Sequence, residues 1–137
     1  MAQPLRILLV EDDSRDADLI VLALRRDGFE PDWRRVDAKA DYLGGLHPGL
    51  DVIISDYSLP GFSGMEALEL LKETGLEIPF MLVSGTIGEE MAVEAMKLGA
   101  SDYLLKDRLA RLGTAVRRVR DQSHRRNQHK QALDALQ

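Results

Sequence analysis

The stretch DVIISDYSLPG, residues 51–61, places three consecutive apolar residues before a serine, an aspartate and a proline–glycine turn. Val52, Ile53 and Ile54 do not alternate with polar residues, which is typical of a strand whose two faces are both buried. Strands of this kind occur in parallel sheets that helices cover on both sides. The stretch therefore predicts a central parallel strand with Asp56 at its carboxyl end.

Similar apolar runs recur on both sides of this stretch and alternate with segments of helical periodicity. We expect strands at residues 5–10, 32–36, 51–55, 79–84 and 102–105. We expect helices at residues 14–27, 38–46, 63–74, 86–98 and from 108 onward. Five strands alternating with five helices predict a doubly wound α/β fold of three layers, with a parallel sheet in the middle.

Local signals mark where several of these helices begin and end. Ser63 and Thr86 each precede a glutamate by three residues, which is the capping-box pattern that starts a helix. Gly28 and Gly99 follow helical segments and are expected to end them. Asp107 is expected to cap the last helix.

The composition is that of an ordinary globular chain, because 45% of its 137 residues are apolar and 30% are charged. The absence of cysteine excludes disulfides and thiolate metal sites. No apolar run approaches the roughly 20 residues of a membrane-spanning helix. The first residues do not have the apolar core of a signal peptide, so we expect a cytoplasmic protein.

Charge is unevenly distributed along the chain. Residues 1–107 include 10 basic and 21 acidic residues, whereas residues 108–137 include 8 basic and 2 acidic ones. A basic segment on an acidic body can indicate a nucleic-acid partner. This segment lacks aromatic residues that could stack on bases, and its charges are spread around the predicted helix. We therefore expect no direct nucleic-acid binding by this chain.

Polar residues follow four of the predicted strands directly, namely Glu11-Asp12-Asp13, Ser55-Asp56, Ser84 and Lys106. The carboxyl ends of parallel strands meet at one edge of the sheet, so at least three carboxylates should gather there. Like charges about 4 Å apart repel by about 4 kcal/mol at an effective dielectric constant near 20, so this edge requires cations.

Lys106 is the nearest protein cation to these carboxylates, because no arginine lies close in sequence to the four strand ends. Mg²⁺ is a suitable second cation, since it binds one or two carboxylates and retains waters. We expect no zinc site, because the three histidines are far from the strand ends in sequence. Asp13 is expected only to cap the helix that follows it.

Four motifs resemble those of the receiver domains of response regulators, and they occur in the same order. They are ILLVEDD at 7–13, DVIISDYSLPG at 51–61 with Gly64, MLVS at 81–84, and GASDYLLK at 99–106. The resemblance covers residues 5–120. It implies a flavodoxin-like sheet of strand order 2-1-3-4-5 with five helices.

The resemblance also implies roles for individual residues at the expected Mg²⁺ site. Asp56 corresponds to the phosphoacceptor and is one of the metal ligands. Glu11 and Asp12 correspond to the family's acidic pair, in which Asp12 binds the metal directly and Glu11 binds it through water. Ser58 corresponds to the residue that provides its backbone carbonyl to the metal.

Three further residues correspond to the groups that respond to the phosphoryl group. Lys106 corresponds to the ammonium that pairs with the phosphoryl oxygens. Ser84 corresponds to the switch hydroxyl, and Tyr103 to the switch aromatic that turns inward with it. Simpler roles remain open, because Ser84 could cap the following helix and Tyr103 could serve only in packing.

Receiver domains of this kind take a phosphoryl group from a histidine kinase or a phosphotransfer protein. They are not enzymes beyond their own phosphorylation and dephosphorylation. The resemblance implies that phosphorylation of Asp56 changes the face formed by the fourth helix, fifth strand and fifth helix, through which a homodimer can form.

Two alternatives remain. One is a receiver-like interaction module that is never phosphorylated. The other is a Mg²⁺-dependent phosphohydrolase or toprim-like enzyme, which would require a second aspartate where this chain has Ser58.

The chain departs from the family after Lys106, where Asp107 replaces the usual proline. The Lys106–Asp107 bond is therefore either cis, at a cost of about 3–4 kcal/mol, or trans with a rearranged loop.

The last predicted helix is longer than the sheet requires. Its apolar stripe comprises Leu109, Leu112, Val116 and Val119 and is interrupted beyond them. We therefore expect a receiver domain at 5–120 and an exposed helical extension or linker stub at 121–137. Such an extension favours a fragment of a longer protein over a stand-alone receiver.

Overall fold

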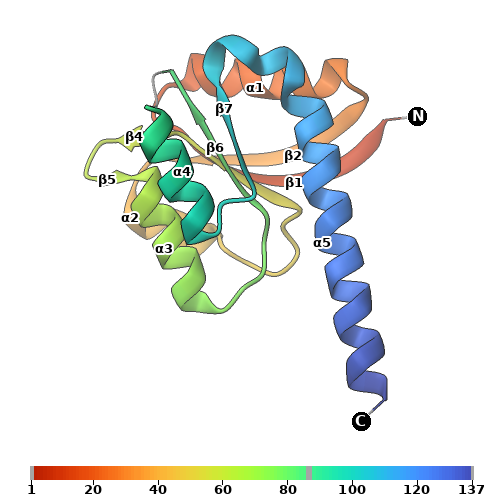
Figure 1. Cartoon of the computed structure of the whole chain (residues 1–137). Helices are drawn as coiled ribbons and strands as arrows, with labels where there is room; N and C mark the ends of the chain where they lie inside the picture. The colour runs from red at the N-terminus through yellow and green to blue at the C-terminus, as the bar shows by residue number, and fades with distance from the viewer. Residues whose placement is uncertain (1, 86–87, 137) are drawn as a thin grey trace.

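The structure, a computed structural model, describes residues 2–85 and 88–136 and is built around a five-stranded sheet (Figure 1). The strands are β1 (Gln3–Val10), β2 (Phe29–Val36), β3 (Val52–Ser55), β6 (Phe80–Ser84) and β7 (Asp102–Leu105). All neighbouring pairs are parallel, and their order is β2-β1-β3-β6-β7. This order confirms the predicted 2-1-3-4-5 arrangement, with β6 and β7 as the fourth and fifth strands.

The helices are α1 (Ser14–Arg26), α2 (Lys39–Gly45), α3 (Gly64–Thr74), α4 (Glu89–Leu98), the 3-10 helix η1 (Lys106–Arg111) and α5 (Leu112–Ala135). Successive residues of β1 alternate between two apolar cores: Ile7 and Leu9 pack with α1 and α5, whereas Leu8 and Val10 pack with α2, α3 and α4. Figure 1 shows these two groups of helices on opposite faces of the sheet. The three predicted layers are confirmed.

Most of the predicted helix signals are found in the structure. Asp13 caps α1 by accepting a hydrogen bond from the backbone N–H of Arg15 at 2.8 Å. Ser63 Oγ accepts one from the backbone N–H of Glu66 at 3.1 Å and so begins α3. Gly99, at a φ of 108°, ends α4 in the left-handed conformation. The predicted Thr86 cap lies outside the described residues.

A short antiparallel ribbon between β3 and α3 was not predicted. It consists of β4 (Ser58–Leu59) and β5 (Phe62–Ser63), joined by the predicted turn at Pro60-Gly61. Gly61 has a φ of 82°, so proline followed by this glycine fits the pattern of a type II turn. Two-residue strands are too short to produce a periodic pattern, which is why only the turn was predicted.

The prediction that Asp107 caps a helix starting near Arg108 is wrong. Lys106–Arg111 forms η1, and α5 begins only at Leu112. The backbone of Arg108 is non-helical, with φ −117° and ψ 30°, which separates the first turn from α5. The Lys106–Asp107 bond is trans. Of the two expectations for this bond, the cis form is therefore wrong.

The first part of α5 is packed into the apolar core, whereas residues 120–136 include no buried side chain and contact the body through polar groups, such as Lys130 Nζ at 3.6 Å from Glu77 Oε1. Leu112, Val116 and Val119 are buried, as predicted, against α1 and the sheet. The guanidinium groups of Arg117 and Arg120 lie 4.7 and 5.5 Å from the centre of the Phe29 ring, within the range of cation–π contacts. Beyond this point α5 projects past the sheet (Figure 1).

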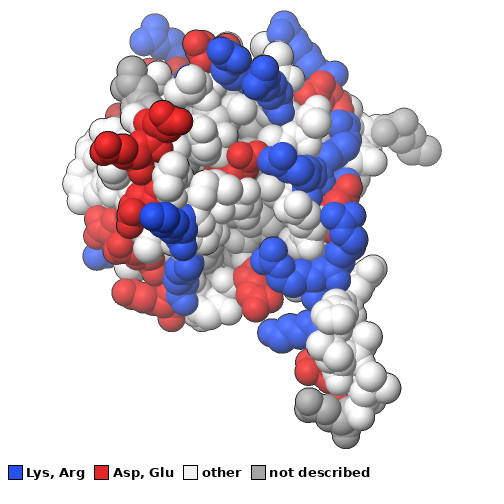
Figure 2. Space-filling view, in the orientation of Figure 1, with Lys and Arg blue, Asp and Glu red and all other residues white. Residues whose placement is uncertain are grey.

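Charged side chains are segregated on one face of the molecule. Figure 2 shows acidic residues over α3 and α4 and basic residues along α5. The acidic residues of these two helices are Glu66, Glu69, Glu73, Glu89, Glu90 and Glu94. Within residues 2–85 and 88–136, no helix combines the length and apolar character needed to cross a bilayer.

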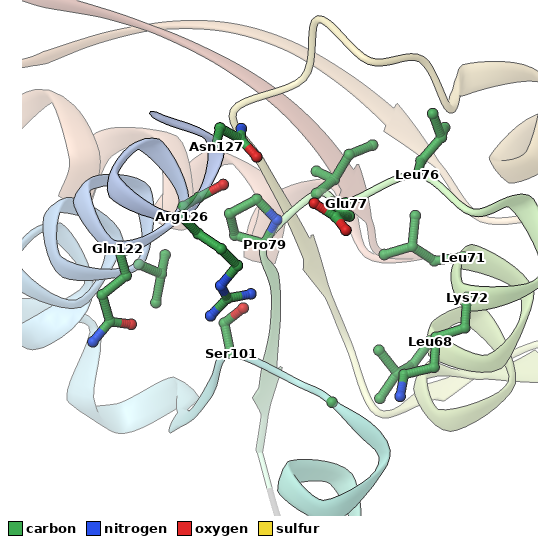
Figure 3. Close-up of a pocket in the computed structure, with 14 residues that line it drawn as sticks. Leu68, Leu71, Lys72, Leu76, Glu77, Pro79, Ser101, Gln122, Arg126 and Asn127 are labelled. Atoms are coloured by element: carbon green, nitrogen blue, oxygen red, sulfur yellow. The ribbon is translucent and has the colours of Figure 1, made fainter. Parts of the chain in front are cut away.

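A hollow lies at the amino-terminal edge of the sheet, between the end of α3, the start of β6 and α5 (Figure 3). Its lining includes Leu71, Pro79, Ser101 and Arg126. The carboxyl ends of the strands, where the sequence predicts the functional residues, are at the opposite edge. This hollow is therefore separate from the predicted site.

The two parts of α5 should respond differently to loss of an apolar side chain. Leu112→Ala removes a fully buried side chain and should lower the free energy of unfolding by about 2–5 kcal/mol. Leu133→Ala, on the same helix but 50% exposed, should change it by less than about 0.5 kcal/mol. Urea denaturation of both variants tests this, and equal losses would contradict the separation of α5 into a buried part and an exposed part.

Candidate functional site

The carboxyl ends of the central strands are held together by backbone hydrogen bonds. The N–H of Asp56 donates to the carbonyl of Val10 at 2.8 Å, which joins the end of β3 to the end of β1. The N–H of Glu11 donates to the carbonyl of Val36 at 3.0 Å, which joins β1 to β2. Glu11 and Asp56 therefore leave adjacent strands at neighbouring positions.

Gly64 allows α3 to begin directly beside Asp56. A Cβ atom at this position would lie 2.5 Å from the Asp56 carbonyl oxygen and 2.7 Å from Leu82 Cδ2. The Gly64 N–H donates to the Tyr57 carbonyl at 2.8 Å, so the glycine is also bonded to this loop. The close approach explains why a glycine is needed at this position.

Three predicted metal ligands come together at this edge. Glu11, Asp12 and Asp56 each place a carboxylate oxygen within 4.8 Å of the others. Glu11 is buried at 2% exposure, the Asp56 side chain is 11% exposed, and Asp12 is open to solvent. A set of oxygen ligands that is buried on one side and open to water on the other fits Mg²⁺, which retains several of its waters.

The ammonium of Lys106 lies among these carboxylates. Its Nζ is 2.9 Å from Glu11 Oε2 and 3.2 Å from Asp56 Oδ2. It is closer still, at 2.6 Å, to Oδ2 of Asp16 in the first turn of α1. Asp16 was not among the predicted site residues, because it lies within the first helix and does not directly follow a strand. The sequence feature that could have indicated Asp16 is its position near the start of the first helix, five residues after Glu11.

The surroundings alter the proton affinity of two of these groups. Burial raises the pKa of Glu11 from 4.5 to about 7, although hydrogen bonds from Lys106 and from the Asp13 N–H oppose the increase. For Lys106, burial alone would lower the pKa, but its hydrogen bonds to Asp16 and Glu11 outweigh this and raise the pKa above its ordinary value. Lys106 therefore remains a cation at neutral pH.

A second cation near the site was missed. Arg35 lies one residue before the end of β2, and its Nη1 donates to the Glu11 carbonyl at 3.2 Å. The same nitrogen is 3.8 Å from Asp37. The end of the edge strand β2 was not among the four strand ends used for the prediction, so the expectation that no arginine lies near the site is wrong for Arg35.

The other three predicted site residues, Ser84, Ser58 and Tyr103, lie on β6, β4 and β7. Ser84 is buried at the end of β6, the strand next to β3. Ser58 begins β4, two residues beyond Asp56. Tyr103 lies on the edge strand β7, is 41% exposed and lines a depression between β7 and α5. The structure therefore brings together Glu11, Asp12, Asp56 and Lys106, while the Tyr103 ring faces outward.

A parallel sheet of this order, with an acidic cluster and a lysine at its carboxyl edge, defines the receiver class of signalling domain. The family model for the response regulator receiver domain matches residues 7–117, so the chain belongs to this family.

Among curated relatives, the cell cycle response regulator CtrA of Brucella ovis is 34% identical over 119 residues. The match covers 83% of this chain and 51% of the relative, so the chain spans about half the length of the curated relatives it matches.

Solved structures agree with this assignment. The response regulator StyR is 27% identical with a TM-score of 0.78, and the match covers 98% of this chain and 68% of that one. The non-phosphorylated receiver domain of HemR from Leptospira biflexa shares the fold, with a TM-score of 0.67 at 24% identity, over 82% of this chain and 94% of that one.

Membership of this family establishes the general function. Receiver domains accept a phosphoryl group in two-component signalling, and they are typically signalling domains without enzymatic activity. They bind Mg²⁺ at an acidic pocket, and this chain has an acidic cluster of that kind.

The raised pKa of Glu11 should make the stability of the metal-free protein depend on pH. Because the pKa is about 7 in the folded chain and near 4.5 when unfolded, folding takes up a proton between these values. Stability should therefore fall as the pH rises from about 4.5 to 7, by at most about 3 kcal/mol from this group. Above pH 7 its contribution should no longer change.

Glu11→Gln removes this titration and serves as the comparison. The free energy of unfolding of the variant, relative to the native chain, should increase with pH across the same range. Urea denaturation in the presence of a chelator at pH 5, 6, 7 and 8 measures the difference. A difference that stays constant from pH 5 to 8 would show that Glu11 has an ordinary pKa.

Proposed function

We propose that this chain receives a phosphoryl group on Asp56 from a histidine kinase or a phosphotransfer protein, with Mg²⁺ bound by Glu11, Asp12, Asp56 and the Ser58 carbonyl. The observation that carries the proposal is the position of the Asp56 carboxylate. It lies within 4.8 Å of ligand atoms of Glu11 and Asp12 and 3.2 Å from the Lys106 ammonium.

The arrangement suits phosphoryl transfer to a carboxylate. An ionised carboxylate is already a nucleophile, so Asp56 needs no general base. One of its oxygens bonds to phosphorus while the bond to the donor breaks, and the leaving group keeps that electron pair. Lys106 is placed to neutralise charge on the transferred oxygens, and Mg²⁺, when bound, supplies further neutralisation.

Two residues connect this chemistry to a change of surface. Ser84 ends the strand beside β3, where its hydroxyl can move toward a phosphoryl group on Asp56. Tyr103 faces outward and can turn inward as Ser84 moves, which changes the surface of α4, β7 and α5. A new charge that biases a two-state element in this way is a common form of signalling switch.

The receiver unit corresponds to residues 5–120, and residues 121–137 are a helical extension or linker. The buried apolar residues of α5 end at Val119, whereas most residues beyond it are exposed. The match to the CtrA relative covers 51% of that protein, so a helical extension or linker at this position agrees with relatives in which the receiver is one part of the chain.

Intact mass spectrometry after incubation with acetyl phosphate and Mg²⁺ tests the phosphoacceptor. The native chain should gain one phosphoryl group, because Asp56 combines a free nucleophile with cationic neighbours. The gain should be absent for Asp56→Asn and should disappear when a chelator removes the metal.

Asp51→Asn provides a matched control, since Asp51 lies at the opposite end of the same strand and should leave the mass gain unchanged. A native chain that binds Mg²⁺ but gains no phosphoryl group would instead indicate a receiver-like interaction module.

Phosphorylation should also promote a homodimer through α4, β7 and α5, because the proposed movement of Ser84 and Tyr103 alters this surface. Sedimentation of native and phosphorylated protein over a range of concentrations should show a stronger association of the phosphorylated form. Asp56→Asn under the same conditions is the control. A phosphorylated chain that stays monomeric at all accessible concentrations would exclude this interface.

A further inference from the structure

Asp16 makes the shortest contact of the Lys106 ammonium, although it is not one of the strand-end residues. Its Oδ2 lies 2.6 Å from Nζ, compared with 3.2 Å for Asp56 Oδ2. The side chains of Asp16 and Lys106 are 32% and 21% exposed, so the pair is partly shielded from water. Lys106 is therefore shared between the first turn of α1 and the phosphoacceptor.

Asp16 could instead serve only to stabilise α1. A carboxylate in the first turn of a helix stabilises the helix through its dipole, whatever it contacts. However, Asp13 already caps α1. The Asp16 side chain also bridges 90 positions of sequence to reach the residue that follows β7. A purely helical role would affect stability alone, whereas a role toward Lys106 would affect the chemistry of Asp56.

The charges at this edge show what such a role would be. Glu11, Asp12, Asp16 and Asp56 can contribute four negative charges, against one positive charge each from Lys106 and Arg35. A dication is favoured by such an excess of negative charge, and each carboxylate adds to the attraction. A phosphoryl group on Asp56 adds negative charge and needs the same ammonium that Asp16 holds.

We propose that Asp16 is a positioning residue that holds the Lys106 ammonium in the unphosphorylated chain and competes for it with the phosphoryl group on Asp56. The inference rests on the proposed function of Asp56. While Asp16 is charged, Lys106 divides its contacts between α1 and Asp56. Asp16 therefore favours the metal-bound, unphosphorylated form over the phosphorylated form.

Asp16→Asn should consequently weaken the binding of Mg²⁺ and, at the same time, make phosphorylation of Asp56 easier. Its affinity for Mg²⁺, measured by calorimetry, should fall about three- to tenfold, because one attracting charge is lost and Lys106 can pair more fully with Asp56. The acetyl phosphate concentration that phosphorylates half of the protein at saturating Mg²⁺ should also fall about three- to tenfold, which means that phosphorylation becomes easier. A merely structural role would leave both properties unchanged, or weaken both together if the loss of stability disturbs the site.

Two variants complete the experiment. Asp18→Asn removes the same charge from an exposed position on the same helix and should leave both measurements near native values. Asp16→Glu keeps the carboxylate and should restore both toward native values even if Asp16→Asn is less stable.

The outcomes separate this inference from the proposed function. If the native chain is phosphorylated but Asp16→Asn weakens both properties, or changes neither, the positioning role is overturned and the phosphoacceptor stands. If the native chain itself gains no phosphoryl group at Asp56, the proposed function fails and this inference fails with it.

Discussion

The carboxylates that the sheet gathers at one edge repel one another, and this repulsion requires cations at the same edge. Glu11 and Asp56 leave adjacent strands with their backbones hydrogen-bonded to neighbouring strands, so neither can move away without disrupting the sheet. The ammonium of Lys106 lies within 3.2 Å of Glu11, Asp16 and Asp56 and offsets part of this repulsion. The repulsion that remains favours the binding of a further cation, and it adds a smaller contribution to the raised pKa of Glu11, whose main cause is burial.

The parallel topology makes this arrangement possible with short loops. Every crossover returns the chain to the opposite edge of the sheet, so all five strands deliver their following residues to the same side. The two faces are then free for packing, and the alternate residues of β1 supply one apolar core each. Gly64 allows α3 to begin in close contact with the Asp56 loop, because a side chain at this position would clash with that loop.

The fold was predictable because strands such as Val52–Ser55 are continuous apolar runs and helices such as α1 begin and end at recognisable residues. The residues that follow strands were predictable for the same reason, since topology alone brings Glu11, Asp56 and Lys106 together. Asp16 and Arg35 were not predictable in this way, because side chains that reach in from a helix or from inside an edge strand leave no mark in the strand pattern. The β4–β5 ribbon and η1 escaped prediction because their conformations depend on tertiary packing.

The connection between Lys106 and α5 has a mechanical consequence. Lys106 is the first residue of η1, and η1 leads directly into the 24-residue α5, whose later half projects beyond the sheet. A helix of that length extends about 36 Å. Residues 120–135 account for about 24 Å of this length, so a change of about 10° in the direction of this exposed part would displace the far end by about 4 Å. A small change in the packing of η1 or of the buried part of α5 therefore becomes a larger displacement outside the domain.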